Sequence, residues 1–106
     1  MLFRSDFIKP YQLEIVICAH EHGLKIIKHS DGNMWPILDD LIEVGLDGYH
    51  PIQPDCMDIS AVKAHVAGKL CLIGNIDCSE LLCSGSEENV ENVVKQTIGT
   101  AAPDGS

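Results

Sequence analysis

The sequence predicts an α/β fold in which short parallel strands alternate with helices. Apolar, β-favouring runs begin roughly every 22 to 24 residues, and a segment with helical spacing of apolar residues follows each run. No hairpin dipeptide joins two of these runs, and no glycine-rich phosphate loop follows an early one. Because polar residues instead follow all three runs, the pattern favours part of a (β/α)8 TIM barrel over an open doubly wound sheet.

Each predicted element has its own start and stop signals. Pro10 and Pro36 suit the first turn of a helix, where a missing N–H costs nothing. Asp58 is expected to cap a helix, and Gly23 and Gly45 suit helix ends. The expected elements, in chain order, are a helix from about Lys9 to His22, a strand over 24–28, a helix over 36–44, a strand over 46–50, a helix over 58–67, a strand over 70–73 and a helix from about Ser86.

The same patterns predict which residues are buried. The run over 70–73 is apolar without alternation, which is typical of a strand covered on both faces. The last helix is expected to bury four apolar residues, Val90, Val93, Val94 and Ile98. The helical residues expected at the solvated surface are His20, His22, His65, Asp39 and Asp40.

Composition and charge exclude several classes of protein. With 106 residues, 45% of them hydrophobic and 22% charged, the chain has the size and composition of one ordinary globular domain. Its 16 acidic and 7 basic residues give a net charge of -9, which opposes binding to nucleic acid or to an anionic membrane. The 5 cysteines form no C-x-x-C pair, and no signal-like or membrane-spanning run occurs, so a cytoplasmic protein with reduced thiols is expected.

The loop after the first predicted strand carries the densest polar chemistry. His29 and Asp31 lie two residues apart, so both can point the same way and act as an acid–base pair or as ligands of a divalent ion. Both are therefore candidate substrate-binding residues, and His29 is also a candidate metal ligand. The alternative is that Asp31 and Asn33 cap the following helix while His29 packs beneath the loop.

The loops after the second and third strands add His50, Asn75 and Asp77 as candidate substrate-binding residues. Pro51 stiffens the second loop, and the amide and carboxylate of the third can fix a ligand or hold neighbouring loops together. The alternatives are a hydrogen-bonded strand-end role for His50 and a capping or solvated role for Asp77. No residue is singled out as catalytic.

Two motifs in these loops, KIIKHSDGN over 25–33 and GNID over 74–77, resemble the uroporphyrinogen decarboxylase superfamily. The resemblance runs from about Phe7 onward. The superfamily contains decarboxylases of porphyrin biosynthesis, which remove carboxylates from the acetate side chains of a tetrapyrrole without a cofactor. It also contains zinc-dependent methyltransferases, which move methyl groups between corrinoid proteins and thiols. The resemblance implies a (β/α)8 barrel and a parent enzyme that is a carboxy-lyase or a methyltransferase acting on a small molecule.

Residue 31 and the charge bear on the choice between these activities. The methyltransferases use a His-x-Cys zinc motif, whose first position matches His29 but whose cysteine is replaced by Asp31. The decarboxylases have an Asp–Gly pair, which Asp31 and Gly32 match. A polycarboxylate substrate should nevertheless meet clustered arginines, and the chain has one, Arg4. The resemblance therefore implies a decarboxylase without a cofactor or, alternatively, a methyltransferase with zinc and a corrinoid protein as partner.

Domain organisation is expected to be that of a partial barrel. Residues 7–106 are interpreted as an incomplete barrel domain of about three βα units, inactive on its own, because complete barrels need about 250 residues. Residues 1–6 are interpreted as a non-native leader, since Leu2–Ser5 matches what a sequencing-adapter end would encode. A second hypothesis is a non-enzymatic half-barrel that pairs with another copy, because three strands leave two open edges.

Overall fold

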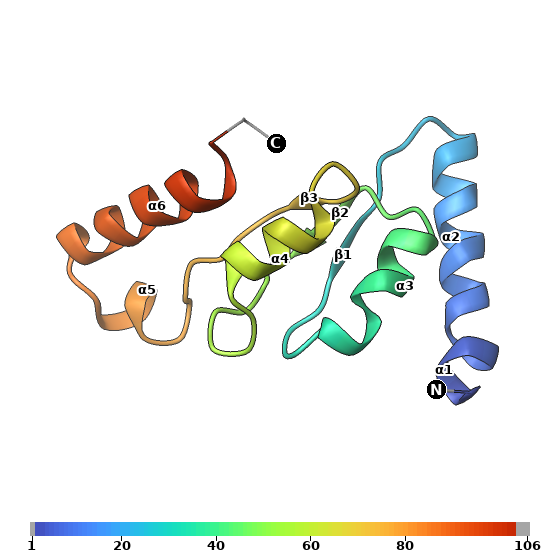
Figure 1. Ribbon diagram of the computed structural model, residues 1–106, viewed down its shortest axis with the longest axis horizontal. Helices are drawn as coiled ribbons and strands as arrows, with labels where there is room; N and C mark the ends of the chain where they lie inside the picture. Colours follow the sequence, from blue (N-terminus) through green and yellow to red (C-terminus); the bar gives the residue numbers. More distant parts are fainter. Residues whose placement is uncertain (1, 104–106) are drawn as a thin grey trace.

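The computed structural model describes residues 2–103, with side chains from Arg4 onward, as an elongated arrangement of helices around a small sheet (Figure 1). Its principal-axis extents are 45 × 28 × 23 Å. The elements, in chain order, are α1 (Leu2–Phe7), α2 (Lys9–Glu21), β1 (Ile27–His29), the 3₁₀ helix η1 (Trp35–Ile37), α3 (Leu38–Glu43), β2 (Gly48–His50), α4 (Ile59–Val66), β3 (Cys71–Leu72), α5 (Leu81–Ser84) and α6 (Glu87–Ala101).

The three strands form one parallel sheet in the order β1-β2-β3. Ile27 pairs with Gly48 and His29 with His50, while Gly48 also pairs with Cys71 across the next ladder. The predicted α/β class with parallel strands is therefore confirmed. The strands are shorter than predicted, because backbone pairing occupies only part of each apolar run: β1 begins at Ile27 rather than at residue 24, and β3 covers only Cys71–Leu72.

Helices η1, α3 and α4 cover one face of this sheet and enclose the core with it. Tyr49 of β2 is fully buried there. The buried apolar residues that form this single cluster are Val16, Met34, Leu38, Leu41, Val44, Leu46, Tyr49, Ile52, Met57, Val62, Val66 and Leu70. Each fully buried side chain of this kind contributes about 1.5–3 kcal/mol, so the cluster is the main source of stability in the described part of the chain.

The opposite face of the sheet has no helix over it among the described residues. On this face, Ile27 is 56% exposed and Ile73 is 37% exposed. Cys71 of β3 is also exposed. A Cβ placed on Gly48 would lie 3.1 Å from Ile27 Cγ1 and 3.5 Å from Ile73 Cδ1, so these side chains meet over Gly48. The prediction that the third strand is covered on both faces was wrong. We call this surface, made by Ile27, Gly48, Cys71 and Ile73, the helix-free face.

Several predicted helix boundaries are confirmed in atomic detail. The Asp58 side chain accepts a hydrogen bond from the Ala61 N–H at 2.8 Å and caps α4. Ser86 caps α6 by accepting from the Asn89 N–H at 3.2 Å. Gly45 follows α3 with φ +85°, a conformation that glycine adopts without steric cost.

The two outer helices, α2 and α6, contribute little to the core (Figure 1). Helix α2 buries Val16 alone. Helix α6 buries no residue fully, and Ile98 is 58% exposed, so the predicted burial of its four apolar residues was wrong. The cause is that α6 packs mainly against α4 and α5, and none of its residues belongs to the core cluster around Tyr49.

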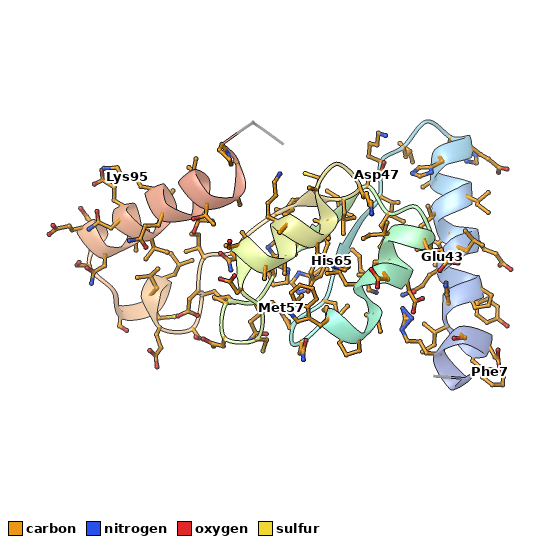
Figure 2. All side chains as sticks on the ribbon, viewed as in Figure 1. Phe7, Glu43, Asp47, Met57, His65 and Lys95 are labelled. Carbon is orange, nitrogen blue, oxygen red and sulfur yellow. The ribbon has the colours of Figure 1, made fainter. Side chains whose placement is uncertain are left out.

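An ion-pair cluster joins the N-terminal helices to α3. Asp40 accepts from Arg4 and Lys9, each at 2.9 Å, and Lys9 also donates to Glu43 at 2.6 Å, where α2 faces α3 (Figure 2). The hydrogen bond from Lys9, more than the charge of Arg4, holds the pKa of Asp40 below its usual value. The prediction of a solvated carboxylate at Asp40 was wrong, because the side chain is half-buried between the helices.

Within residues 2–103, no helix has the length and apolar character needed to cross a membrane.

Candidate functional site

A groove of 310 Å³ opens where the loops after β1, β2 and β3 converge. The residues that line it come from all three loops: Asp31, Pro51, Gln53, Pro54, Ile76, Asp77, Cys78 and Ser79. Parallel strands place their carboxyl ends at the same edge of a sheet, which explains why loops distant in sequence meet here. We call this the strand-end groove.

A histidine pair stands beside the groove, at the ends of β1 and β2. His29 and His50 are register partners, and neighbouring strands lie about 4.8 Å apart, so their side chains emerge together on the same face. Their Nδ1 atoms are 2.7 Å apart, and their ring centroids are 4.9 Å apart with the planes tilted by 33°. His29 belongs to the strand and does not pack beneath the loop, because its side chain is 62% exposed.

Asp31 extends this pair on the groove side. Its Oδ2 lies 3.5 Å from Nε2 of His29, and its side chain is 71% exposed. Asn33 makes a local hydrogen bond, in which its Oδ1 accepts from the Trp35 N–H at 3.1 Å, but the N-cap of η1 is Met34, which has no side-chain cap bond. Asp31 is therefore placed beside the imidazole, and neither it nor Asn33 caps the following helix.

Three hydrogen bonds fasten the loop after β1 to β2 and to the loop that follows β2. The sequence did not predict these bonds. The Ser30 N–H donates to the His50 carbonyl at 3.0 Å, and the Tyr49 hydroxyl donates to the Ser30 carbonyl at 3.0 Å. The Gly32 N–H donates to Oε1 of Gln53 at 2.8 Å. Burial, with a further contribution from the negative charge of Asp31, raises the pKa of the Tyr49 hydroxyl, so it stays protonated and able to donate.

The third loop comes into direct backbone contact with the second. Gly74 has φ +134°, and a Cβ built on it would lie 1.9 Å from the Pro51 carbonyl oxygen. The next residue, Asn75, is 8% exposed and is the buried polar residue of the described part of the chain. Asn75 is thus held at the base of the loop and does not line the groove surface.

Asp77 lines the groove and also organises its own loop. Its carboxylate accepts from the Ser79 hydroxyl at 2.6 Å, and from the backbone N–H groups of Ser79, Glu80 and Leu81 at 2.9 to 3.1 Å. These bonds, that of the Ser79 hydroxyl first, hold the pKa of Asp77 far below its usual value. Its carboxylate caps the turn into α5, a helix that sequence reasoning did not predict.

This capping predicts a pH dependence of stability that an Asp77→Asn variant isolates. A carboxyl whose pKa is lowered by folding stabilises the protein above its unfolded pKa, usually 3.8, and this contribution is lost as the pH falls further. We expect the variant to melt at a lower temperature than the unmodified chain at neutral pH. The difference in melting temperature should narrow progressively below about pH 4, because only the unmodified chain loses a charged cap there. Thermal melts followed by circular dichroism measure this difference, and a difference that does not change with pH would contradict the capping role of Asp77.

The described residues do not assemble a ligand set for zinc. No group of three or more His, Cys, Asp or Glu side chains gathers as a metal site within residues 4–103. Two imidazole nitrogens on one zinc ion lie about 3.3 Å apart, given Zn–N bonds of about 2.0 Å. The Nδ1 atoms of His29 and His50 are 2.7 Å apart, which is a hydrogen-bonding distance.

A comparison with known protein families finds a match over nearly the whole chain. The family model described as "Uroporphyrinogen decarboxylase (URO-D)" matches residues 3–105. The chain belongs to the uroporphyrinogen decarboxylase family. Neither a curated protein nor a solved structure gives a significant match. The family resemblance based on HSDGN and GNID is therefore confirmed.

In this uroporphyrinogen decarboxylase family chain, four of the five predicted site residues lie at the edge of the sheet where the strands end. His29, Asp31 and His50 form a continuous cluster, and Asp77 lies across the groove from the second loop. Gln53 and Tyr49 are the additional residues that position the loops. The only sequence signal for Gln53 is its place between Pro51 and Pro54 in a stiffened loop.

Proposed function

We propose that this chain supplies strand-end loops of a (β/α)8-barrel enzyme that decarboxylates acetate side chains of a tetrapyrrole. The observation that carries the proposal is the contact of His29 with His50, 2.7 Å between Nδ1 atoms, beside a groove built by three successive strand-end loops. Active sites of (β/α)8 barrels lie at this end of the strands. Membership of the uroporphyrinogen decarboxylase family supports this class of reaction.

The helix-free face supports the barrel part of the proposal. In a (β/α)8 barrel the helices cover the outside, and the inward residues of the strands pack against one another. Ile27, Gly48 and Cys71 form a row on the helix-free face, and His29 and His50 follow two residues further along their strands. An exposed apolar row of this kind needs cover, which the remaining strands of a barrel would provide.

The charged residues that line the groove are acidic, so binding of a carboxylate there requires positive charge from elsewhere. Asp31 and Asp77 line it, and no lysine or arginine is among the described residues that do. Arg4 instead pairs with Asp40, away from the groove. The cationic side chains that a polycarboxylate substrate needs therefore have to come from other parts of the barrel.

Binding of uroporphyrin to the chain tests this function. Uroporphyrin is the stable oxidised form of the proposed substrate, and coproporphyrin, which has methyl groups in place of the acetates, is the matched product-type probe. We expect saturable quenching of porphyrin fluorescence with tighter binding of uroporphyrin. Replacing His50 with glutamine should weaken that binding about tenfold, the equivalent of one lost charge-assisted contact of about 1.4 kcal/mol.

His65→Gln is the control variant, because it makes the same change in a histidine that has a polar partner, Asp39 at 2.6 Å, but lies on α4 outside the groove. It should bind uroporphyrin as tightly as the unmodified chain does. Equal affinity for the two porphyrins, or equal weakening by both histidine variants, would contradict the proposal.

A corrinoid-linked methyltransferase is the second candidate, favoured by the acidic lining of the groove, which suits a substrate without carboxylates. Zinc bound by a longer form of the chain that carries the family's remaining strands, and not by residues 4–103 alone, would favour it, because the described residues assemble no ligand set for zinc.

A further inference from the structure

Three side chains form a continuous line at the ends of β1 and β2. Asp31 Oδ2 lies 3.5 Å from Nε2 of His29, and Nδ1 of His29 lies 2.7 Å from Nδ1 of His50. Both nitrogens of His29 are therefore engaged, one by a carboxylate and one by an imidazole. This geometry determines where the protons of the pair reside.

The nearby carboxylate favours one tautomer of His29. An anionic oxygen opposite a bare nitrogen lone pair is repelled, so Nε2 of His29, which faces Asp31, carries the proton. In a neutral imidazole the other nitrogen is then an acceptor. Nδ1 of His29 therefore accepts a hydrogen bond.

The tautomer of His29 in turn fixes that of His50. A hydrogen bond between two nitrogens needs one donor, so Nδ1 of His50 donates to Nδ1 of His29 across the 2.7 Å. The remaining nitrogen, Nε2 of His50, makes no hydrogen bond within the described part of the chain. It can gain or lose a proton without breaking either contact, and His29 keeps its orientation in both states.

We propose that His50 is the proton-transferring catalytic residue of the reaction proposed above, and that His29 and Asp31 are positioning residues that orient it. The inference rests on the proposed decarboxylation. When the C–C bond to the carboxylate breaks, CO2 leaves and the electron pair stays on the substrate carbon. Nε2–H of protonated His50 gives its proton to that carbon, forming the C–H bond, and neutral His50 then takes a proton from water.

The placement of His50 agrees with this role. It immediately precedes Pro51, which lines the strand-end groove, and the Ser30 N–H holds its carbonyl at 3.0 Å. The imidazole therefore extends from a backbone that is fixed on both sides, by the sheet register and by the first loop.

Imidazole ¹⁵N spectra of the full chain test the inference without any substrate. Signals are assigned by their loss in His29→Gln and His50→Gln. We expect a single tautomer for each residue at a pH where both are neutral, with the proton on Nε2 of His29 and on Nδ1 of His50, and a coupling between the two Nδ1 atoms. Protons on Nδ1 of His29 and Nε2 of His50, or a mixture of tautomers at both residues, would overturn it.

Asp31→Asn and Asp39→Asn form a matched pair, because each aspartate faces one histidine. Asp31→Asn should convert the single tautomers of His29 and His50 into mixtures, whereas Asp39→Asn should alter only the signals of His65. Unchanged tautomers in Asp31→Asn would show that Asp31 positions neither imidazole. Because these spectra need no ligand, failure of uroporphyrin binding and failure of the tautomer assignment are separate results.

Discussion

Replacing Gly74 with alanine is expected to lower the free energy of unfolding by about 2 to 6 kcal/mol, the sum of backbone strain and overpacking. The added Cβ would lie 1.9 Å from the Pro51 carbonyl oxygen, a backbone atom that cannot rotate away. Its φ of +134° is in addition rarely adopted by residues with a side chain. Urea denaturation followed by circular dichroism measures the change.

Gly68→Ala is the matched control for this substitution. Gly68 also has a positive φ, +73°, but nothing lies within 4 Å of the Cβ that alanine would add. The control should therefore cost only about 1 to 2 kcal/mol, the strain of a left-handed residue. A similar loss in both variants would mean that the loop after β3 moves away from Pro51 at little cost.

Gly74 also illustrates how far sequence reasoning reaches in this fold. The GNID motif pointed to a family, yet nothing in those letters says why glycine is needed before Asn75. The reason is the approach of Pro51, a residue 23 positions earlier in the chain, which only the folded arrangement of β2 and β3 produces. Local signals, by contrast, act within one turn of helix, so the caps at Asp58 and Ser86 could be predicted correctly.

The candidate site divides in the same way. Placement of His29 and His50 at strand ends could be predicted from the alternation of apolar and polar segments, but their 2.7 Å contact depends on the register between β1 and β2. A shift of one residue would send the two side chains to opposite faces. The sequence left open whether Asp77 binds a ligand or caps a turn. Four hydrogen bonds show that its carboxylate caps the turn into α5, and the residue also lines the groove.

Tyr49→Ala is expected to have the second large effect, a loss of about 3 to 5 kcal/mol in the free energy of unfolding. The ring is fully buried at the centre of the core, between the sheet and its covering helices. Its removal leaves a cavity and also releases the Ser30 carbonyl, to which the hydroxyl donates at 3.0 Å. Equilibrium unfolding in urea measures the loss, and a change below about 1 kcal/mol would contradict the packing described here.

Tyr49→Phe separates packing from the hydrogen bond. It keeps the ring and removes only the hydroxyl, so the cost should be about 0.5 to 1.5 kcal/mol. Because Ser30 joins His29 to Asp31, the loss should reach the site: the ¹⁵N signals of His29 are expected to shift, while those of His65 stay in place. Unchanged His29 signals would mean that the Ser30 N–H and Gly32 N–H bonds hold the first loop without Tyr49. The core of this domain and the orientation of its histidine pair therefore depend on the same residue, through different atoms of one side chain.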